Sequence, residues 1–278
     1  MQSIKAIMIA AILLLIIKTL PAQRSNWEFQ LGGGICSENV YLGSDDYYVT
    51  PLPNFKASYT GGSFTYSISI LEGLGINYMK PILGFYTGLN INVGETRNTE
   101  EYSVAGVSVK HNKKTQKLLE GTPDTETQLA LDLMLIYPSR IGLLGLSMAY
   151  HPTQVRYNEG DMKETIRNGY IYSVLYMIEL PASDRMSIGA MVNIGLMDRS
   201  YADTWYSVDE ETLSLKTFHA DAGLRSTMFA AEIKYKLSGN ISLSLIGAGT
   251  MLLGDAKESP FTREPVQGKL VMQTLYHF

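Results

Sequence analysis

Long segments of the chain alternate apolar and polar residues, and this alternation limits the possible folds more than any other feature of the sequence. In Ser63–Ile70 (SFTYSISI) and Arg185–Leu196 (RMSIGAMVNIGL), every second residue is apolar. Three further segments, Gly169–Leu180, Phe229–Leu237 and Ile241–Leu253, keep the same period. Successive side chains of a β-strand point to opposite faces, so a period of two predicts strands. The fold class that we expect is therefore all-β.

The length of these segments distinguishes between two kinds of β protein. In Phe229–Leu237 the charged residues Glu232, Lys234 and Lys236 alternate with apolar ones. A soluble sandwich buries its apolar face, whereas a membrane barrel turns that face toward lipid. Several alternating segments have 10 to 13 residues. Strands of soluble proteins are usually about 5–6 residues long, and membrane strands need about 9–11. We therefore expect a transmembrane antiparallel β-barrel.

The connections and the C-terminus agree with that expectation. Short turns with the sequences TGGS, YPSR, PASD and LSGN alternate with long polar connections at Asn158–Asn168, Tyr201–His219 and Asp255–Gly268. Short periplasmic turns and longer extracellular loops are typical of outer-membrane barrels. The chain ends in KLVMQTLYHF, which places Tyr276 and Phe278 on one apolar face. This strand resembles the signal read by the barrel-assembly machinery, and Tyr276 and Phe278 are its predicted residues.

The strand count is expected to be about 12. Eleven strands are clear in the sequence, and they start near Trp27, Val49, Ser63, Lys80, Thr127, Arg140, Gly169, Arg185, Ala222, Ile241 and Lys269. Both termini of a bacterial barrel face the periplasm, so the number of strands is even. Tyr102–His111 (YSVAGVSVKH) is the best candidate for the twelfth strand. A barrel of 10 strands, with the first segment packed elsewhere, is the alternative.

The N-terminal residues are typical of an export signal. Lys5 precedes the apolar run AIMIAAILLLII, and the small residue Ala22 follows in LPAQ. The run from Ala6 to Ile17 has 12 residues, whereas a membrane-spanning helix needs about 20. A signal peptide is therefore expected at residues 1–22, with an uncleaved anchor as the alternative. Residues 23–278 form the predicted barrel domain, located in the bacterial outer membrane.

Charge and cysteine content exclude several classes of function. The chain has 23 basic and 27 acidic residues, without the basic surplus that nucleic-acid binding requires. Its single cysteine, Cys36, can form neither an internal disulfide nor a zinc knuckle. We expect no cofactor and no metal. The expected surroundings are outer-membrane lipid and lipopolysaccharide.

The stretch YLGSDDYYVTPLP, residues 41–53, interrupts the alternation with two adjacent carboxylates, Asp45 and Asp46. Aspartate side chains bond nearby backbone N–H groups and favour turns. Tyr47 and Tyr48 fit an aromatic belt at the membrane surface, and the two prolines fit a strand start or edge. A shaped loop is the first interpretation. Contact of Asp45, Asp46, Tyr47 and Tyr48 with a partner, or binding of a cation by the two aspartates, is the alternative.

The chain resembles the MipA/OmpV family of outer-membrane proteins, whose founding name is MltA-interacting protein. The resemblance rests on GSDDYYVTPLP, on GLGINY soon after it, on ADAGLRS, and on LLGDAKESPF before a last strand ending in YHF. Order and spacing agree over essentially the whole chain after residue 22. The insertion from Glu95 to Glu126 departs from the more compact form of the family.

The resemblance implies a non-enzymatic envelope protein. One member of the family is a scaffold between a lytic transglycosylase and a penicillin-binding murein synthase, and these two enzymes are the partners implied here. Other members are linked to permeation or adhesion, so a narrow passive pore or an adhesin is the alternative. Lumen residues for a pore are Asp132, Glu179, Glu232, Lys234 and Lys236. A less favoured alternative is a lipid hydrolase that uses His219, Asp221 and Ser226; no catalytic residue is assigned.

Overall fold

The chain forms a closed antiparallel barrel of twelve strands. A computed structural model describes residues 26–94, 96–104, 107–127, 129–157 and 163–278. Going round the barrel, the order is β10-β5-β4-β3-β2-β1-β16-β15-β14-β13-β12-β11, and β10 pairs with β11 to close it. The strands are β1 (Trp27–Asn39), β2 (Tyr47–Gly61), β3 (Phe64–Ser69), β4 (Gly73–Ile82), β5 (Phe85–Val93), β10 (Leu129–Ser139), β11 (Gly142–Tyr157), β12 (Lys163–Ser183), β13 (Met186–Met197), β14 (Gly223–Lys236), β15 (Ile241–Leu252) and β16 (Val266–His277). The predicted fold class and strand count are confirmed.

The twelfth strand of the barrel is not the segment that was predicted from the sequence. The predicted strand near Lys80 is two strands, β4 and β5, joined by a tight turn at Leu83 and Gly84, whose φ angles are 52° and 87°. Residues 102–104 and 107–111 do not enter the barrel. They belong to a separate hairpin of β7 (Glu101–Val104) and β8 (Val107–Lys110). The assignment of Tyr102–His111 as the twelfth barrel strand was therefore wrong.

Apolar side chains face outward, as expected for a wall in contact with lipid. On β14 and β15, Ile233 and Leu245 are each 43% exposed on the outer surface. Their neighbours point inward, where Ser244 donates a 2.7 Å hydrogen bond to Glu232, and Lys234 lies 3.2 Å from the same carboxylate. Ser187 donates to Glu179 at 2.9 Å. The predicted lumen charges therefore pair partly with one another.

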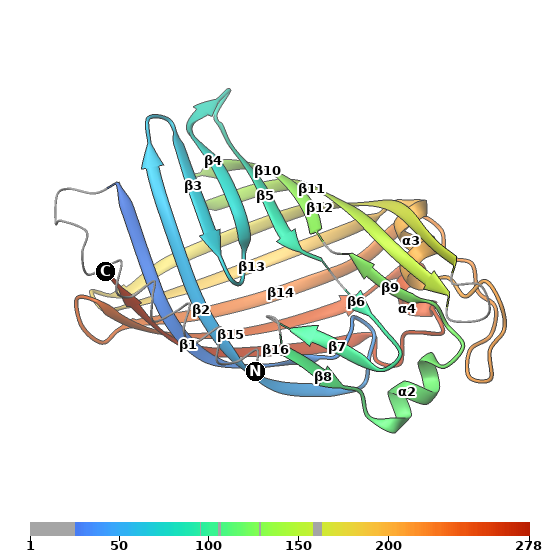
Figure 1. Ribbon diagram of the computed structural model, residues 1–278. Helices are drawn as coiled ribbons and strands as arrows, with labels where there is room; N and C mark the ends of the chain where they lie inside the picture. The colour runs from blue at the N-terminus through green and yellow to red at the C-terminus, as the bar shows by residue number, and fades with distance from the viewer. Residues whose placement is uncertain (1–25, 95, 105–106, 128, 158–162) are drawn as a thin grey trace.

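The two ends of the barrel differ, as Figure 1 shows. At one end lie the tight turns and the C-terminus. At the other end lie three helices: α2 (Lys113–Leu119), α3 (Arg199–Tyr206) and α4 (Gly254–Glu258). Two short strands, β6 (Thr96–Arg97) and β9 (Asp124–Thr127), extend the wall there beyond β5 and β10. By the rule for outer-membrane barrels, the turn end faces the periplasm and the helical end faces outward.

The signal peptide expected at residues 1–22 lies outside the described residues. Within the described ranges, no helix is long and apolar enough to span a membrane.

Removal of Tyr276–Phe278 is expected to reduce the amount of assembled barrel in the outer membrane. Tyr276 and Phe278 are 42% and 49% exposed on the outer face, and their rings lie 4.7 Å apart. The deletion also removes the last pairings of β16 with β1. Assembly is measured as the heat-modifiable band on gels of isolated outer membranes. Wild-type levels of that band in the truncated protein would contradict the assignment of these residues as an assembly signal.

Candidate functional site

The outward end of the barrel carries a packed cap, which we define as the connection 40–46, helices α2, α3 and α4, and the connections 207–222 and 253–265. One buried cluster joins helix α3 to the inner wall, where Tyr201, Ala202, Trp205 and Tyr206 pack against wall residues such as Ile171 and Leu252. A second cluster comprises Leu118, Leu119, Val208, Leu215 and Phe261, with Tyr41 against it. The two larger apolar clusters of the described residues therefore lie at the helical end of the barrel.

Helix α3 explains why the region Tyr201–His219 is more than a polar loop. The Asp198 carboxylate accepts a 2.7 Å hydrogen bond from the backbone N–H of Tyr201, so it caps the helix N-terminus. Gly169 on β12 allows helix α3 to approach the strand closely, because a Cβ at this position would lie 2.8 Å from the Tyr201 Cα. His151 on β11 meets the Tyr201 ring edge-on, with 5.3 Å between the ring centroids. The sequence signal for this docked helix was the Asp198 cap before an aromatic-rich segment.

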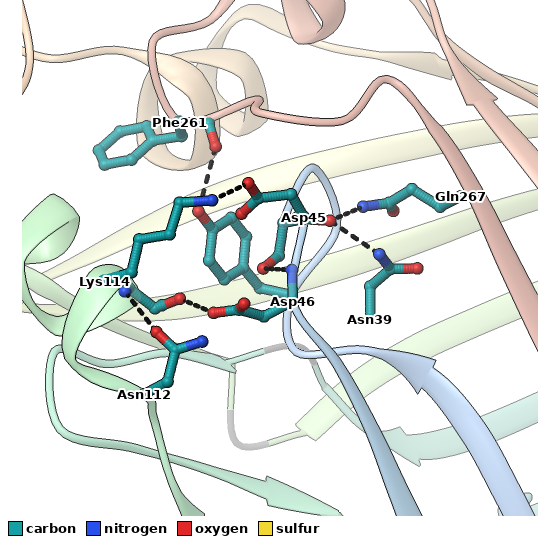
Figure 2. Close-up of polar contacts among 10 residues, drawn as sticks. Asn39, Asp45, Asp46, Asn112, Lys114, Phe261 and Gln267 are labelled. Carbon is teal, nitrogen blue, oxygen red and sulfur yellow. Dashed lines mark hydrogen bonds and ion pairs between the residues drawn. The ribbon is translucent and has the colours of Figure 1, made fainter.

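The connection 40–46, which contains Asp45 and Asp46, holds the cap together (Figure 2). Lys114 on α2 donates to the Asp45 carboxylate, and the Thr115 hydroxyl donates to Asp46. Asn112 caps the same helix by accepting from the Thr115 N–H at 2.9 Å. The two aspartates therefore fasten helix α2, which belongs to the insertion at residues 95–126, to the start of β2.

The same connection also binds the other side of the mouth. The Ser44 carbonyl accepts from the side chains of Asn39 at 2.7 Å and Gln267 at 2.9 Å. Tyr41 donates from its hydroxyl to the Phe261 carbonyl at 3.1 Å. Burial raises the pKa of Tyr41 to about 12, so this hydroxyl keeps its proton at neutral pH. Gly43 has a φ of 106°, which favours glycine, and its carbonyl accepts from the Arg263 N–H at 2.7 Å.

The structure separates Tyr47 from Tyr48, which the sequence had grouped in one aromatic belt. Tyr47 is 52% exposed on the outer wall and accepts a 3.2 Å hydrogen bond from the Gly268 N–H. Tyr48 points inward and donates to Glu38, which also forms an ion pair with Lys269. Adjacent residues of a strand face opposite sides, so only Tyr47 can belong to an outer belt. A role for these four residues in binding a partner stays a prediction.

Arg97 lies at the centre of the cap, and sequence reasoning missed it. Its guanidinium carbon lies 3.7 Å from the centroid of the Phe261 ring and 5.8 Å from that of the Trp205 ring. One terminal nitrogen donates to the Trp205 carbonyl. Burial lowers the pKa of Arg97 to about 10, which still leaves it charged at neutral pH. An isolated arginine in a polar insertion carries no sequence signal for such a position.

The residues of the hydrolase alternative do not form a hydrogen-bonded set. His219 is exposed, Asp221 lies 3.6 Å from Arg199, and no hydrogen bond joins His219 to Ser226 among the described residues. The described part of the chain likewise contains no group of three or more histidine, cysteine, aspartate or glutamate residues placed to hold a metal ion. The arrangement at the barrel mouth is therefore one of packing and ion pairing.

The closed barrel, the alternation of apolar and polar residues along its strands, and the cap of loops and helices define an outer-membrane β-barrel protein. The sequence profile of the family described as MltA-interacting protein MipA matches residues 31–278, and the chain belongs to that family. It is located in the outer membrane.

Several solved structures are similar to this chain. The translocator domain of the autotransporter NalP from Neisseria meningitidis covers 100% of this chain and 97% of its own, at 8% identity and a TM-score of 0.46. The NanC porin covers 89% and 98%, at 10% identity and a TM-score of 0.44. OmpT of Vibrio cholerae covers 93% and 99%, at 8% identity and a TM-score of 0.40. No curated protein matches the chain significantly.

Replacing both aspartates by asparagine is expected to change stability by less than about 1 kcal/mol. The Asp45–Lys114 pair is exposed, with side-chain exposures of 33% and 69%, and such pairs contribute about 0–1 kcal/mol. Asparagine at position 46 can still accept from Thr115. Asp46→Ala, by contrast, leaves the Thr115 hydroxyl, on a residue that is 3% exposed, without its acceptor, at a cost of about 1–3 kcal/mol. Urea unfolding midpoints in micelles measure the stability of the double asparagine variant and of Asp46→Ala. Equal losses of stability in the two variants would contradict the assigned contacts.

Proposed function

We propose that the protein is a non-enzymatic scaffold that holds a lytic transglycosylase and a penicillin-binding murein synthase at the periplasmic face of the outer membrane. The family description, MltA-interacting protein, supports an interaction with a transglycosylase. The observation that favours the proposal over a pore is the cap, because its two buried clusters occupy the outward end of the barrel. A general diffusion channel needs an open path at that end.

The turn end offers a small apolar surface for such partners. Leu83, in the β4–β5 turn, is 93% exposed, and Ile141, in the β10–β11 turn, is 78% exposed. The two turns are neighbours, because β5 pairs with β10, and Phe85 lies 5.4 Å from Tyr137 between their ring centroids. Apolar side chains that gather into one exposed patch mark protein or membrane contacts, whereas single ones do not. We propose that Leu83 and Ile141 belong to the partner surface.

The test is capture of the two murein enzymes from solubilised envelopes by the tagged barrel after crosslinking. We expect Leu83→Asp with Ile141→Asp to reduce capture at least about tenfold, since buried apolar anchors dominate interface energies. Aspartate tolerates the positive φ at position 83 better than most residues. Leu213→Asp is the matched control, because Leu213 is also 93% exposed but lies in the cap at the other end.

Two outcomes would contradict the scaffold. The first is that neither enzyme is captured by the wild-type barrel. The second is stable, open conductance steps of the intact protein in planar bilayers, which would favour the pore. Loss of capture in the Leu213→Asp variant alone would contradict the assignment of the partner surface to Leu83 and Ile141.

A further inference from the structure

A cavity of about 1090 Å³ opens within the cap, between the ends of β11 and β12, the residues around β6 and β9, and the connection after α3. Its lining combines charged and polar residues with apolar ones, among them Val208 and Phe261 of the second cluster. Arg167 is already satisfied there, since it lies 2.7 Å from Asp203 and 3.5 Å from Asp209. Asp124 accepts from the Thr99 N–H at 2.8 Å. The remaining charged groups decide what the cavity can bind.

The cavity wall contains a buried positive charge, that of Arg97. No carboxylate of the described residues lies within ion-pair distance of it, although Asp124, which also lines the cavity, stabilises the charge electrostatically from farther away. Arg97 lines the cavity but is only 4% exposed. Among the described residues, its polar contact is the Trp205 carbonyl, and its Nε atom is buried without a hydrogen-bond acceptor. A ring face compensates a buried cation only partly. The Nε–H group therefore offers a hydrogen bond to an acceptor, preferably an anionic one, that enters the cavity.

The lining of the cavity also carries negative charge. Glu100, Glu120 and Glu210 line it and are exposed. None of the three carboxylates lies within ion-pair distance of a lysine or arginine in the described part of the chain. Carboxylates gathered around a cavity attract ammonium groups and raise the local concentration of cations. The lining of the cavity thus combines one buried arginine, Arg97, with exposed carboxylates that have no cationic partner among the described residues.

We propose that this cavity binds a zwitterionic amino acid or short peptide, with its carboxylate on Arg97 and its ammonium group among Glu100, Glu120 and Glu210. A charge-assisted hydrogen bond to Nε satisfies the buried guanidinium, and the planar fork of arginine suits a carboxylate. The ammonium group neutralises part of the charge of the carboxylates. This site is independent of the scaffold function and of the turn-end surface.

Titration calorimetry of the full barrel in micelles tests the assignment with alanine, dialanine and trialanine. The length series shows which separation of the two charges fits. The best ligand is then compared with its N-acetylated form and its C-terminal amide. We expect saturable binding of at least one zwitterion, and at least about a tenfold loss when either charge is blocked.

Two sets of variants test which residues bind the ammonium group and which bind the carboxylate of the ligand. In Glu100→Gln/Glu120→Gln/Glu210→Gln, the zwitterion and its N-acetylated form should bind equally. Glu258→Gln removes an exposed carboxylate that does not line the cavity and should bind as wild type does. In Arg97→Lys, which keeps the positive charge but loses the planar fork, the preference for the zwitterion over its amide should fall.

Substitution of Arg97 can disturb the cap. If Arg97→Lys does not fold, the proposal is tested by the glutamine variants and the blocked ligands alone. Absence of saturable heat with all three ligands at millimolar concentration would overturn the proposal. Equal affinity for free and blocked ligands in the wild type would do the same.

Discussion

Leu245→Arg is expected to weaken folding into a lipid bilayer by about 2–4 kcal/mol, the cost of an arginine on the lipid-facing wall near the bilayer midplane. Leu245 lies near the middle of β15 (Ile241–Leu252) and is 43% exposed on the outer face. It pairs with Ile233 of β14, whose side chain is also exposed. The arginine side chain must therefore lie in hydrocarbon or bend toward an interface.

Two control variants separate the effect of charge from that of size and position. Leu245→Ala removes the same side chain without adding charge, and we expect it to cost much less. Glu232→Gln changes an inward-facing residue that contacts Ser244 and Lys234, and it should alter folding by no more than a surface ion pair, about 0–1 kcal/mol. Urea titrations of refolding into lipid vesicles measure all three. A Leu245→Arg protein as stable as Leu245→Ala would refute a lipid-facing wall.

The barrel could be predicted from the sequence because a local sequence pattern, visible within each strand, determines its wall. Each strand alternates apolar and polar residues, and the short turns carry Gly, Pro, Ser or Asn. The wall faces lipid on its outside and water or paired charges on its inside, and these two environments require the alternation of apolar and polar residues. A single sequence is therefore enough to reveal it. The inward charge of Glu232 and the outward position of Ile233 followed directly.

The strand boundary at Leu83 was missed because the turn lacks the usual residues. A two-residue hairpin with positive φ at both central positions normally contains Asn-Gly or Asp-Gly. Here Leu83 takes φ 52° ahead of Gly84. The apolar run around ILGF therefore looked like the interior of one strand, and the missing strand was sought at Tyr102–His111 instead.

The cap could not be predicted, because its contacts join segments far apart in the sequence. Asp45 and Asp46 lie in the connection between β1 and β2, but their contacts on α2 lie 69 residues away in each case. Arg97 meets Trp205 and Phe261 across still larger separations. No local pattern shows which polar loops meet, and the charge pattern of the cavity exists only after the loops have packed.

Gly169→Leu is expected to detach helix α3 from the barrel wall and to destabilise the cap by about 1–3 kcal/mol, the usual cost of forcing atoms into a packed site. A Cβ on Gly169 would lie 2.7 Å from the Tyr201 Cβ and 3.0 Å from the Tyr201 backbone nitrogen. Backbone atoms cannot turn aside as a flexible side chain can. The helix must therefore move, and with it Trp205, which is only 7% exposed.

Tryptophan fluorescence reports this movement. The chain has two tryptophans, Trp27 and Trp205, so Trp27→Phe leaves Trp205 as the only emitter. In that background, Gly169→Leu should shift the emission to longer wavelength and expose the connection 207–222 to proteases, while the heat-modifiable barrel persists. Gly223→Leu is the matched control, since a Cβ at Gly223 would meet no atom within 4 Å. Unchanged emission in Gly169→Leu would show that α3 does not rest on β12, and would remove the packing that joins the cap to the wall.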